Sequence, residues 1–542
     1  MTGGAGGAGG YTEALTVSTG VQNCRLTATM SAGDTVVGVT DEGGYATMEI
    51  PTGVEFIVRV QPPDGYLVPD PQTVTMIYGT PQNMTFALIQ SAVISVTVTD
   101  EKTEGGAGAV GATVKISQNG DVIETKTTDS LAKASFTVAP GTYSITGTAA
   151  DGETMLSSSE VTVAGGMTSA VTLKVVYNIV YGFSIAVGTA DPDARVTYPQ
   201  TVFGQTNAAY GKTPASGTGA NCMNGWAGCE LISGIKRQTG SGSAWTDVSD
   251  KKKAVAGSAS SMVMTYVPTR YMKMTNDGTN IICAFSMEQI DSTWKDYAGS
   301  VGSNHVGHFR VGCYVCKSDF KSYTGSPKVN TRLTGFISGC QKLGTGYDIM
   351  TWYQWMYLAA LAVLLYKSTD LQAAMASGYV SASSVQSESA LTFTNDYGMA
   401  GTPGNTGTTQ MAFFWIQNLW GNMSQFVGGA KTNSSYKLMT CTGYSSTDEA
   451  DFDKKSLGGP SSDINGAIKT VVGTTDAGFF PTDCSGSKTT YFADYGSVDS
   501  SGFPYVGGRF NIDDSAGPFF AAFDYTVSGS SSSLGSRLSY RL

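Results

Sequence analysis

Two stretches of the first third decide how the chain begins to fold: GVTDEGGYATMEIPTGVEFIV at residues 38–58 and KTTDSLAKASFTVAPGTYSIT at residues 126–146. They align without a gap at an offset of 88 residues. The aligned pairs are Thr40 with Thr128, Asp41 with Asp129, Ala46 with Ala134, and Gly53 with Gly141. A period near 90 residues corresponds to one small β-domain, because a solenoid repeats over much shorter units.

Polar and apolar residues alternate within each copy, as in SAVISVTVTD at 91–100 and in ATVKISQNGDVIETKTT at 112–128, which contains an Asn-Gly turn. Short alternating strands between frequent turns predict β-sandwiches. The T-D-x-x-G-x-A-x-x-x-x-P-G run resembles the prealbumin-like, Cna-B-like and carboxypeptidase-regulatory-like immunoglobulin modules, which usually act as spacers. We therefore expect two immunoglobulin-like sandwiches, at 11–90 and 91–176.

The aspartates of the repeat, Asp41 and Asp129, suggest either calcium ligands or turn caps. A calcium site needs six to eight oxygen ligands, and neither aspartate has a cluster of oxygen donors beside it in the sequence. The pattern therefore favours a turn-capping role.

Composition limits the function classes. Hydrophobic residues make up 41% of the chain, enough for real cores, but charged residues make up only 14%. Low charge with 68 glycines is typical of extracellular β-rich proteins and virion fibres. A net charge of −10 without a long basic run argues against nucleic acid as a partner. The leader at residues 1–10, MTGGAGGAGG, lacks the pattern of a signal peptide and is typical of a flexible tether.

The nine cysteines are odd in number and widely spread, which favours buried, reduced thiols. A bridge between Cys222 and Cys229 stays open as an alternative. The positions of these cysteines are Cys24, Cys222, Cys229, Cys283, Cys313, Cys316, Cys340, Cys441 and Cys484.

His305, His308, Cys313 and Cys316 have the spacing H-x2-H-x4-C-x2-C, which offers four zinc-type ligands. The surrounding FRVGCYVCKSDF is typical of a strand, in which residues three apart point to opposite faces. We therefore expect no metal there.

Residues Ile349–Tyr366, IMTWYQWMYLAALAVLLY, carry no charge but are short for a membrane span. Thr351 and Gln354 form a capping-box pattern at their start. We expect a buried helix at 350–372 that covers a sheet, a shorter helix at 371–377, and no membrane insertion. The chain after residue 176 is expected to be an adaptor at 177–259 followed by an α+β head at 260–542.

Three segments of this second half resemble the C-type lectin fold of the formylglycine-generating-enzyme type. GHFRVGCYVCKSDF at 307–320 resembles its opening strand pair, and GTGYDIMTWYQWMYLAAL at 344–361 resembles its G-x-x-L-x-T-x-x-x-W helix start. NLWGNMSQFVGG at 418–429 resembles its N-x-x-G-N-V-W-E-W signature. The resemblance implies an α+β lectin-type domain. The enzyme branch uses a late cysteine pair, whereas Cys484 is the last cysteine here. Binding without a cofactor is therefore expected, and a formylglycine-generating-type enzyme or carbohydrate hydrolase is the less favoured alternative.

The tail VGGRFNIDDSAGPFFAAFDYTVSGSSSSLGSRLSYRL at 506–542 resembles the variable region of diversity-generating-retroelement target proteins. Phe510 stands where that family usually has Trp. The family motif otherwise holds at Gly507, Gly508, Ala516, Gly517, Gly535, Arg537 and Leu538. In that family a rigid frame carries side chains that vary. The resemblance carries the role of displayed, ligand-binding residues over to Phe503, Tyr505, Asn511, Ile512, Asp514, Phe519, Ala521, Asp524 and Tyr525.

The sequence thus predicts a receptor-binding protein of a phage or prophage tail, located in the virion. A bacterial cell-surface adhesin with the same head is the alternative. The expected partners are a host-cell surface protein or glycan, other tail proteins of the virion, and further copies of the chain in a homo-oligomer such as a trimer.

Overall fold

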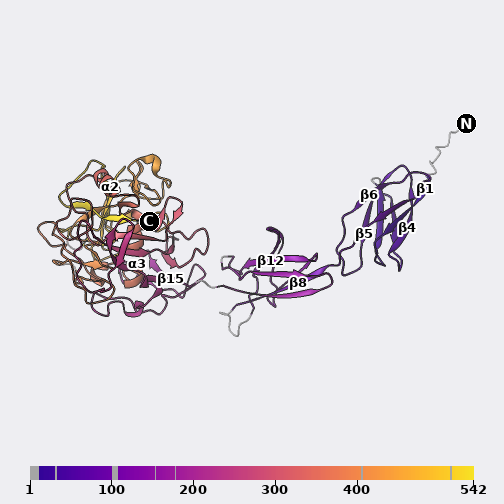
Figure 1. Cartoon of the computed structure of the whole chain (residues 1–542), viewed down its shortest axis with the longest axis horizontal. Coiled ribbons are helices and arrows are strands. Elements are labelled where there is room, and N and C mark those ends of the chain that lie inside the picture. The colour runs from indigo at the N-terminus through magenta and orange to yellow at the C-terminus, as the bar shows by residue number, and fades with distance from the viewer. Residues whose placement is uncertain are drawn as a thin grey trace. The chain divides into compact units, whose positions relative to one another are not determined.

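The computed structural model describes residues 11–30, 33–100, 108–152, 154–176, 179–404, 407–512 and 515–542. The chain divides into two compact units, Met1–Tyr177 and Asn178–Leu542. The structure is mostly β-sheet, and several of its sheets pack as sandwiches (Figure 1). Asp514, one of the predicted binding residues, and the predicted leader lie outside the described residues.

The first unit contains two sandwiches of identical strand order. The first pairs a β4-β1-β7 sheet with a β3-β2-β5-β6 sheet, and the second pairs β11-β8-β14 with β10-β9-β12-β13. The strands of the first sandwich are β1 Thr12–Ser18, β2 Arg25–Met30, β3 Thr35–Val39, β4 Tyr45–Pro51, β5 Glu55–Gln61, β6 Gln72–Thr75 and β7 Gln82–Thr85. The strands of the second are β8 Ala92–Thr99, β9 Thr113–Gln118, β10 Asp121–Thr127, β11 Lys133–Val138, β12 Gly141–Thr148, β13 Ser159–Val163 and β14 Thr168–Lys174.

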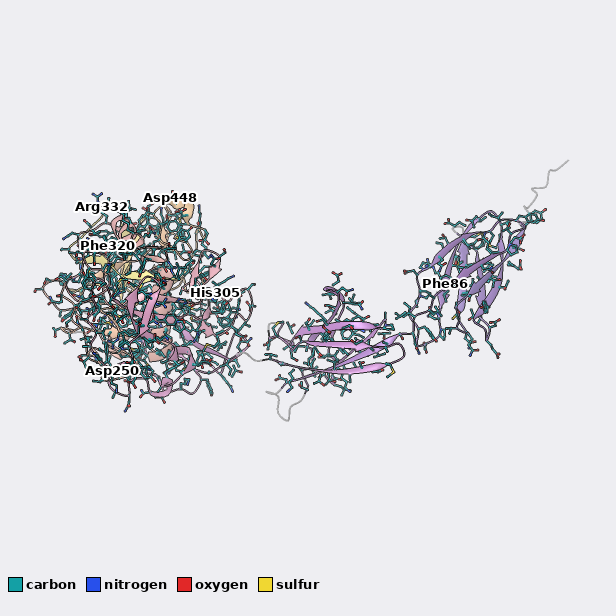
Figure 2. The ribbon with its side chains drawn as sticks, in the orientation of Figure 1. Phe86, Asp250, His305, Phe320, Arg332 and Asp448 are labelled. Carbon is teal, nitrogen blue, oxygen red and sulfur yellow. The ribbon has the colours of Figure 1, made fainter. Side chains whose placement is uncertain are left out.

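Each sandwich has its own apolar core, because alternate strand residues point inward from both sheets. In the first, Leu15, Leu26 and Phe56 come from different strands and are fully buried. Phe86 closes the same core (Figure 2). In the second, Ile94, Val114 and Phe136 have the corresponding role. These cores confirm that the repeat encodes two all-β units.

The repeated aspartates cap turns, as the sequence predicted. Asp41 Oδ1 accepts hydrogen bonds from the backbone N–H groups of Gly43 and Tyr45, both at 2.9 Å. Asp129 Oδ1 does the same for Leu131 and Lys133, at 2.8 and 3.0 Å. These bonds hold the pKa of Asp129 below its usual value. The equivalent geometry explains why both aspartates sit at the same place in the repeat.

Three larger sheets form the second unit. The first has the order β17-β18-β15-β23-β22, with β16 paired to β15. The second has the order β20-β19-β21-β26-β40-β27, and the third has the order β33-β36-β38-β37-β30-β39. The strands of the first sheet are β15 Ile179–Ala186, β16 Val196–Thr197, β17 Thr201–Val202, β18 Gln205–Asn207, β22 Tyr271–Asn276 and β23 Asn280–Ser286. Those of the second are β19 Lys236–Ser241, β20 Ala244–Asp247, β21 Met262–Pro268, β26 His308–Gly312, β27 Tyr347–Ile349 and β40 Leu538–Tyr540. Those of the third are β30 Ser424–Phe426, β33 Ile464–Ala467, β36 Tyr495–Val498, β37 Phe503–Val506, β38 Ala521–Tyr525 and β39 Leu534–Ser536.

Shorter elements complete this unit. The two-stranded ladders are β24 Ser300–Val301 with β25 Asn304–His305, β28 Ala412–Phe413 with β29 Ile416–Gln417, β31 Ala430–Thr432 with β32 Leu438–Thr440, and β34 Thr470–Val471 with β35 Pro481–Asp483. The helices are α1 Glu230–Ser233, α2 Leu333–Gln341, α3 Trp352–Tyr366 and α4 Leu371–Ala374, with 3-10 turns at Asn224–Trp226 and Glu449–Asp451.

Helix α3 begins where the sequence predicted. The Thr351 hydroxyl accepts a hydrogen bond from the Gln354 N–H at 3.4 Å, and Gln354 Oε1 accepts one from the Thr351 N–H at 3.0 Å. This is the reciprocal capping box. The helix ends earlier than predicted, because Lys367 takes a left-handed conformation with φ 54°.

The surroundings of α3 correct a second detail. All 15 of its residues are buried, so the helix does not cover a sheet with one face but forms the centre of the main core (Figure 1). Within the described part of the chain, no helix is long and apolar enough to cross a membrane.

The predicted boundary between an adaptor at 177–259 and a head starting at 260 does not divide the structure. Strands β19 and β21 come from opposite sides of it and pair along their length, with Gln238 opposite Met264. Strand β15 likewise pairs with β23 across it. Residues from Tyr181 to Phe523 share the largest hydrophobic core. This core therefore contains residues from both sides of the predicted boundary.

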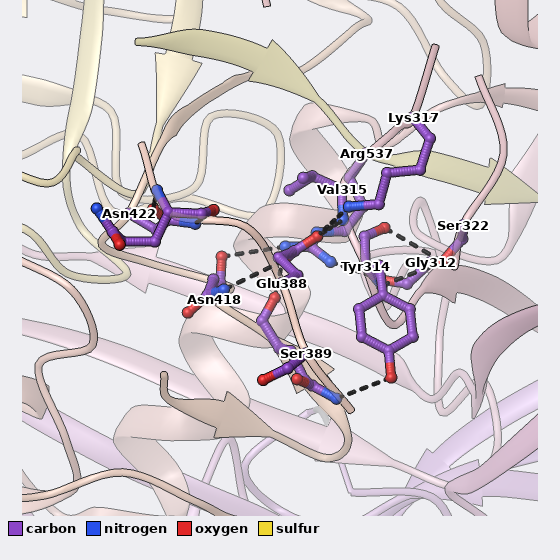
Figure 3. Close-up of polar contacts among 12 residues, drawn as sticks. Gly312, Tyr314, Val315, Lys317, Ser322, Glu388, Ser389, Asn418, Asn422 and Arg537 are labelled. Atoms are coloured by element: carbon purple, nitrogen blue, oxygen red, sulfur yellow. Dashed lines mark hydrogen bonds and ion pairs between the residues drawn. The ribbon is translucent and has the colours of Figure 1, made fainter. Parts of the chain in front are cut away.

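The last strands tie the end of the chain into two sheets. Strand β39 runs parallel to β30, and β40 inserts between β26 and β27. Between them, the fully buried Arg537 donates to Gln425 Oε1 at 2.9 Å and to the Gly312 carbonyl at 2.8 Å (Figure 3). Its remaining nitrogen donates to the carbonyls of Gln417 and Asn418. The Gly535-x-Arg537 motif is thus a structural latch.

Candidate functional site

A pocket of about 250 Å³ opens on the third sheet, within the C-terminal region that the sequence singled out. Its walls come from strands β30, β36 and β37 and from the segment between β37 and β38. The lining residues are Ser424, Tyr495, Tyr505, Arg509, Ile512, Ser515 and Phe520. A narrow extension shares Ser424, Tyr505 and Arg509 and is also lined by Tyr525, Ser531, Ser533 and Leu534.

Aromatic rings form a continuous wall. The Phe520 ring lies 5.7 Å from the Tyr495 ring and 6.0 Å from the Tyr505 ring, centroid to centroid. Tyr505 in turn meets Tyr525 edge-on at 5.4 Å. Rings held at such distances stabilise one another and expose flat apolar faces. The wall is therefore suited to hold an apolar face of a ligand.

Two phenols of this wall stay protonated at neutral pH. Burial and then the nearby Asp524 carboxylate raise the pKa of both Tyr505 and Tyr495. The Tyr505 hydroxyl lies 3.4 Å from Asp524 Oδ2. Both hydroxyls can therefore act as hydrogen-bond donors as well as acceptors.

Tight backbone packing fixes the segment that crosses the pocket. Gly508 has φ 73°, and a Cβ there would lie 2.6 Å from Ala516 Cβ and from Ile512 Cδ1. A Cβ on Gly517 would lie 2.3 Å from Asp494 Oδ1, and that carboxylate accepts a hydrogen bond from the Phe519 N–H at 2.8 Å. Only glycine fits both positions, as the frame predicted from sequence requires.

The structure brings together four of the predicted residues. Tyr505 and Ile512 line the pocket, Tyr525 lines its extension, and Asp524 contacts Tyr505. Asn511 is exposed beside Ile512.

Three predicted residues are not displayed. Phe503 is buried in a core shared with Phe426, while Phe519 and Ala521 are buried in the core around α3. Phe519 packs edge-on against Phe479 at 5.0 Å. The prediction that these side chains are exposed is wrong, because each points to the inner face of its strand or turn.

The error concerns the turn just before β38. Phe519 in this turn belongs to the core around α3, whereas the next residue, Phe520, lines the pocket. The two neighbouring side chains point to different sides, so choosing the wrong one of them exchanges core for surface. A bulge between β37 and β38 further shifts the register between Phe503 and Tyr505.

Sequence reasoning missed Ser424, Tyr495, Arg509, Ser515 and Phe520. Arg509 directly follows the glycine pair Gly507 and Gly508, so its position next to the predicted frame could have identified it as a site residue. Ser424 and Tyr495 lie on strands far away in the chain, and no local pattern connects them to the tail.

The candidate zinc ligands do not converge in the structure. Strand β26 ends at Gly312, and Cys313 packs in the α3 core while Cys316 packs in the neighbouring core beside Cys340. His305 lies on the surface, 2.8 Å from Asp296 Oδ2 (Figure 2). Over the described ranges, no group of three or more His, Cys, Asp or Glu side chains could hold a metal ion.

All nine cysteines are buried free thiols, as the sequence favoured. The alternative bridge between Cys222 and Cys229 is not formed. Burial raises the pKa of the Cys222 and Cys313 thiols to about 11.

Comparison with known proteins gives limited similarity. No protein-family model matches the sequence, and no curated protein matches it. Among solved structures, the chain is similar to the Bacillus anthracis TIE protein at 13% identity and a TM-score of 0.17, covering 51% of this chain and 44% of that one. It is also similar to a minor pilin of Streptococcus agalactiae at 10% identity and a TM-score of 0.19, covering 30% and 96%. A shaft pilin of Lactobacillus rhamnosus GG matches at 11% identity and a TM-score of 0.18, covering 30% and 98%.

The chain thus spans less than half the length of the TIE protein. TM-scores this low define no common fold for the whole chain. Function is therefore inferred from the pocket and its surroundings.

Proposed function

We propose that the chain is a ligand-recognition protein that attaches to a cell surface through the C-terminal pocket. The observation that carries the proposal is the wall formed by Tyr495, Phe520 and Tyr505 around a concave site. Tyrosine gives a large contact area at a low entropy cost, and nearby serines supply adaptable hydrogen bonds. Pockets with apolar walls and a few polar groups are the usual form of small-ligand sites.

The frame around the pocket supports a second part of the proposal, that the tail varies between related proteins. Asn511 is exposed and Ile512 is half-buried, and both lie between the tightly packed Gly508 and Ala516. Changes at such positions leave the α3 core intact. This separation of tightly packed frame positions from exposed positions supports a lectin-type domain whose displayed residues are diversified.

The setting that we propose is the bacterial cell surface, where two immunoglobulin-like modules would act as spacers for the binding unit. The phage-tail setting, with tail proteins as partners, stays a prediction from the sequence. A homo-oligomer such as a trimer would raise weak single-site affinity by about 10²–10⁴ through avidity. Antibody labelling of intact cells and of purified virions separates the two settings.

We propose binding rather than catalysis. Burial and the neighbouring Asp483 raise the pKa of the Cys484 thiol to about 12. A thiol needs to lose its proton to act as a nucleophile, so this cysteine is poorly suited to thiol chemistry. Thiol-dependent turnover that is abolished by Cys484→Ser would contradict the proposal.

Attachment of the purified chain to bacterial cells tests the function. We expect Tyr505→Ala to reduce attachment at least about tenfold, because it removes the central ring of the wall, and a truncated hot-spot residue costs 2 kcal/mol or more. The matched control is Tyr210→Ala, since Tyr210 is 59% exposed outside the pocket. Unchanged attachment by a folded Tyr505→Ala protein would rule out the pocket as the binding site.

A further inference from the structure

Among the residues that the structure describes, Arg509 is the only formally charged one that lines either the pocket or its extension. Its side chain is exposed and donates one hydrogen bond, from Nη1 to Ser533 Oγ at 3.2 Å. A guanidinium carries five N–H donors in a planar fork that matches a carboxylate. Within the described residues, the other donors of this fork have no hydrogen-bond partner.

Ser424 provides a second, independent observation. It lines both cavities at 2% exposure, and its hydroxyl has no hydrogen-bond partner among the described residues. A buried polar group without a partner costs free energy, so it needs a reason to persist. A ligand hydroxyl that enters the pocket would satisfy it.

The lining as a whole is rich in hydroxyls. Four of the seven pocket residues carry one: Ser424, Tyr495, Tyr505 and Ser515. Apart from Arg509, the remaining lining residues, Ile512 and Phe520, are apolar. A sugar ring combines C–H faces that pack on aromatic rings with hydroxyls at its edges, so it matches both halves of this lining.

The charge distribution orients such a ligand. Asp524 lies beside Tyr505, and after burial its carboxylate is the next cause that raises the pKa of Asp499 and of Tyr495. Arg509 lines the same pocket, and its positive charge opposes the rise in the pKa of Tyr505. An anionic group is therefore repelled from the Asp524 side and attracted to Arg509.

We propose that the pocket binds an acidic sugar residue of a surface glycan, with its carboxylate on Arg509, a ring face on the aromatic wall and a hydroxyl on Ser424. This inference rests on the proposed function and adds the chemical class of its ligand. A peptide with a free terminal carboxylate and an aromatic side chain is the competing ligand.

Calorimetric titration of the full chain tests the carboxylate. The probes are methyl glucuronide, the uncharged methyl glucoside, N-acetylphenylalanine and N-acetylphenylalaninamide. We expect the glucuronide to bind at least about tenfold more tightly than the glucoside, since a hydrogen bond to a charged group contributes roughly 1.5–3 kcal/mol. Equal binding of both sugars, or binding of N-acetylphenylalanine without the glucuronide, would overturn the proposal.

Two variants locate the contacts. Arg509→Gln is expected to remove the preference for the glucuronide, while Arg59→Gln, an equal charge change on β5 of the first sandwich, leaves it unchanged. Ser424→Ala is expected to weaken binding about two- to tenfold, as one lost hydrogen bond implies, without lowering the melting temperature of the free protein. Loss of stability without loss of affinity would make Ser424 a structural residue and overturn its assigned role.

The two proposals fail differently. If Tyr505→Ala loses cell attachment but none of the acidic sugars binds or competes, the glycan proposal is wrong while the recognition function stands. If Tyr505→Ala attaches normally, the recognition function itself is wrong.

Discussion

The Lys317 ammonium lies 2.7 Å from Glu388 Oε2 in the interior of the second unit, where the two side chains are 3% and 0% exposed. Glu388 also accepts hydrogen bonds from the Val315 N–H at 3.0 Å and from Asn418 Nδ2 at 3.2 Å (Figure 3). One ion pair thus connects the loop after β26, the segment before β28 and the NLWGN turn. Arg537, adjacent to this network, bonds to Gln425 on β30, the strand that carries Ser424 of the pocket.

Removal of the Glu388 charge should destabilise the protein strongly. Glu388→Gln leaves a buried ammonium without its counter-charge, and breaking such a pair costs about 3–5 kcal/mol. Chemical denaturation measures the free energy of unfolding. Asp247→Asn is the control, since it breaks the exposed pair with Lys236 and should cost no more than about 1 kcal/mol. Equal effects in the two variants would contradict this prediction.

The two sandwiches should respond alike to loss of their buried threonine. The Thr40 hydroxyl donates to the Val21 carbonyl at 2.7 Å and accepts from the Cys24 N–H at 2.9 Å. Thr128 makes the same bonds with Ala109 and Ala112, at 2.7 and 2.9 Å.

Thr40→Val and Thr128→Val should each cost about 1–3 kcal/mol, because both leave buried backbone groups without partners. Separate expression of residues 11–90 and 91–176 allows each unfolding transition to be measured. Thr47→Val, on the exposed side of β4, is the control and should change stability little. A large cost in one sandwich only would show that the bonds are not equivalent.

Substitution of Phe519 and of Tyr525 should distinguish a core residue from a residue of the pocket. Phe519→Ala should lower stability by about 3–5 kcal/mol, as expected for a buried phenylalanine. Tyr525→Ala should cost clearly less stability, because its ring is half-buried in the extension of the pocket. Thermal melts combined with cell attachment measure both effects. If the Phe519→Ala protein attaches less well at a temperature where it is fully folded, Phe519 belongs to the binding site and this prediction is wrong.

Asp494 should make stability depend on pH. Burial raises the pKa of this carboxyl well above its usual value, so the folded state holds the proton more tightly than the unfolded chain does. Its contribution to stability is full below the unfolded pKa and is lost as the pH rises through the folded pKa.

Asp494→Asn keeps an oxygen for the Phe519 N–H but does not titrate. The variant should therefore gain stability relative to the wild type as the pH rises from 4 to 8. Denaturation curves across this range measure the difference. A difference that stays constant or falls with pH would contradict the sign.

The native thiols should be unreactive. Burial raises the pKa of Cys441 and Cys484 to about 12, and only the thiolate reacts with disulfide reagents. We expect no rapid reaction at pH 8 in the folded protein and nine reactive thiols per chain after denaturation. Fewer than nine in the denatured, unreduced chain would reveal a disulfide, for which Cys316 and Cys340, with sulfurs 3.8 Å apart, are the nearest candidates.

The sequence by itself determined the features that depend on neighbouring residues. The 88-residue offset gave two sandwiches of equal topology, since the same turn residues recur at the same places. The Thr351 and Gln354 pair fixed the start of α3, and the Gly508 and Gly517 frame marked the region of the site. Each of these rests on backbone conformation or on bonds within a few residues, which local sequence specifies directly.

Only the tertiary structure decided which side chains form the pocket. Ser424, Tyr495 and Tyr505 lie on separate strands, and the pairing of β36, β38, β37 and β30 brings them together. The side of the sheet that each strand residue faces depends on strand register. In the turn before β38, the packing of the unit places Phe519 in the core and Phe520 at the pocket. Register is set by contacts across the whole unit, including strands β39 and β40 at the end of the chain. For that reason the tail sequence predicted where the site lies but not which residues form it.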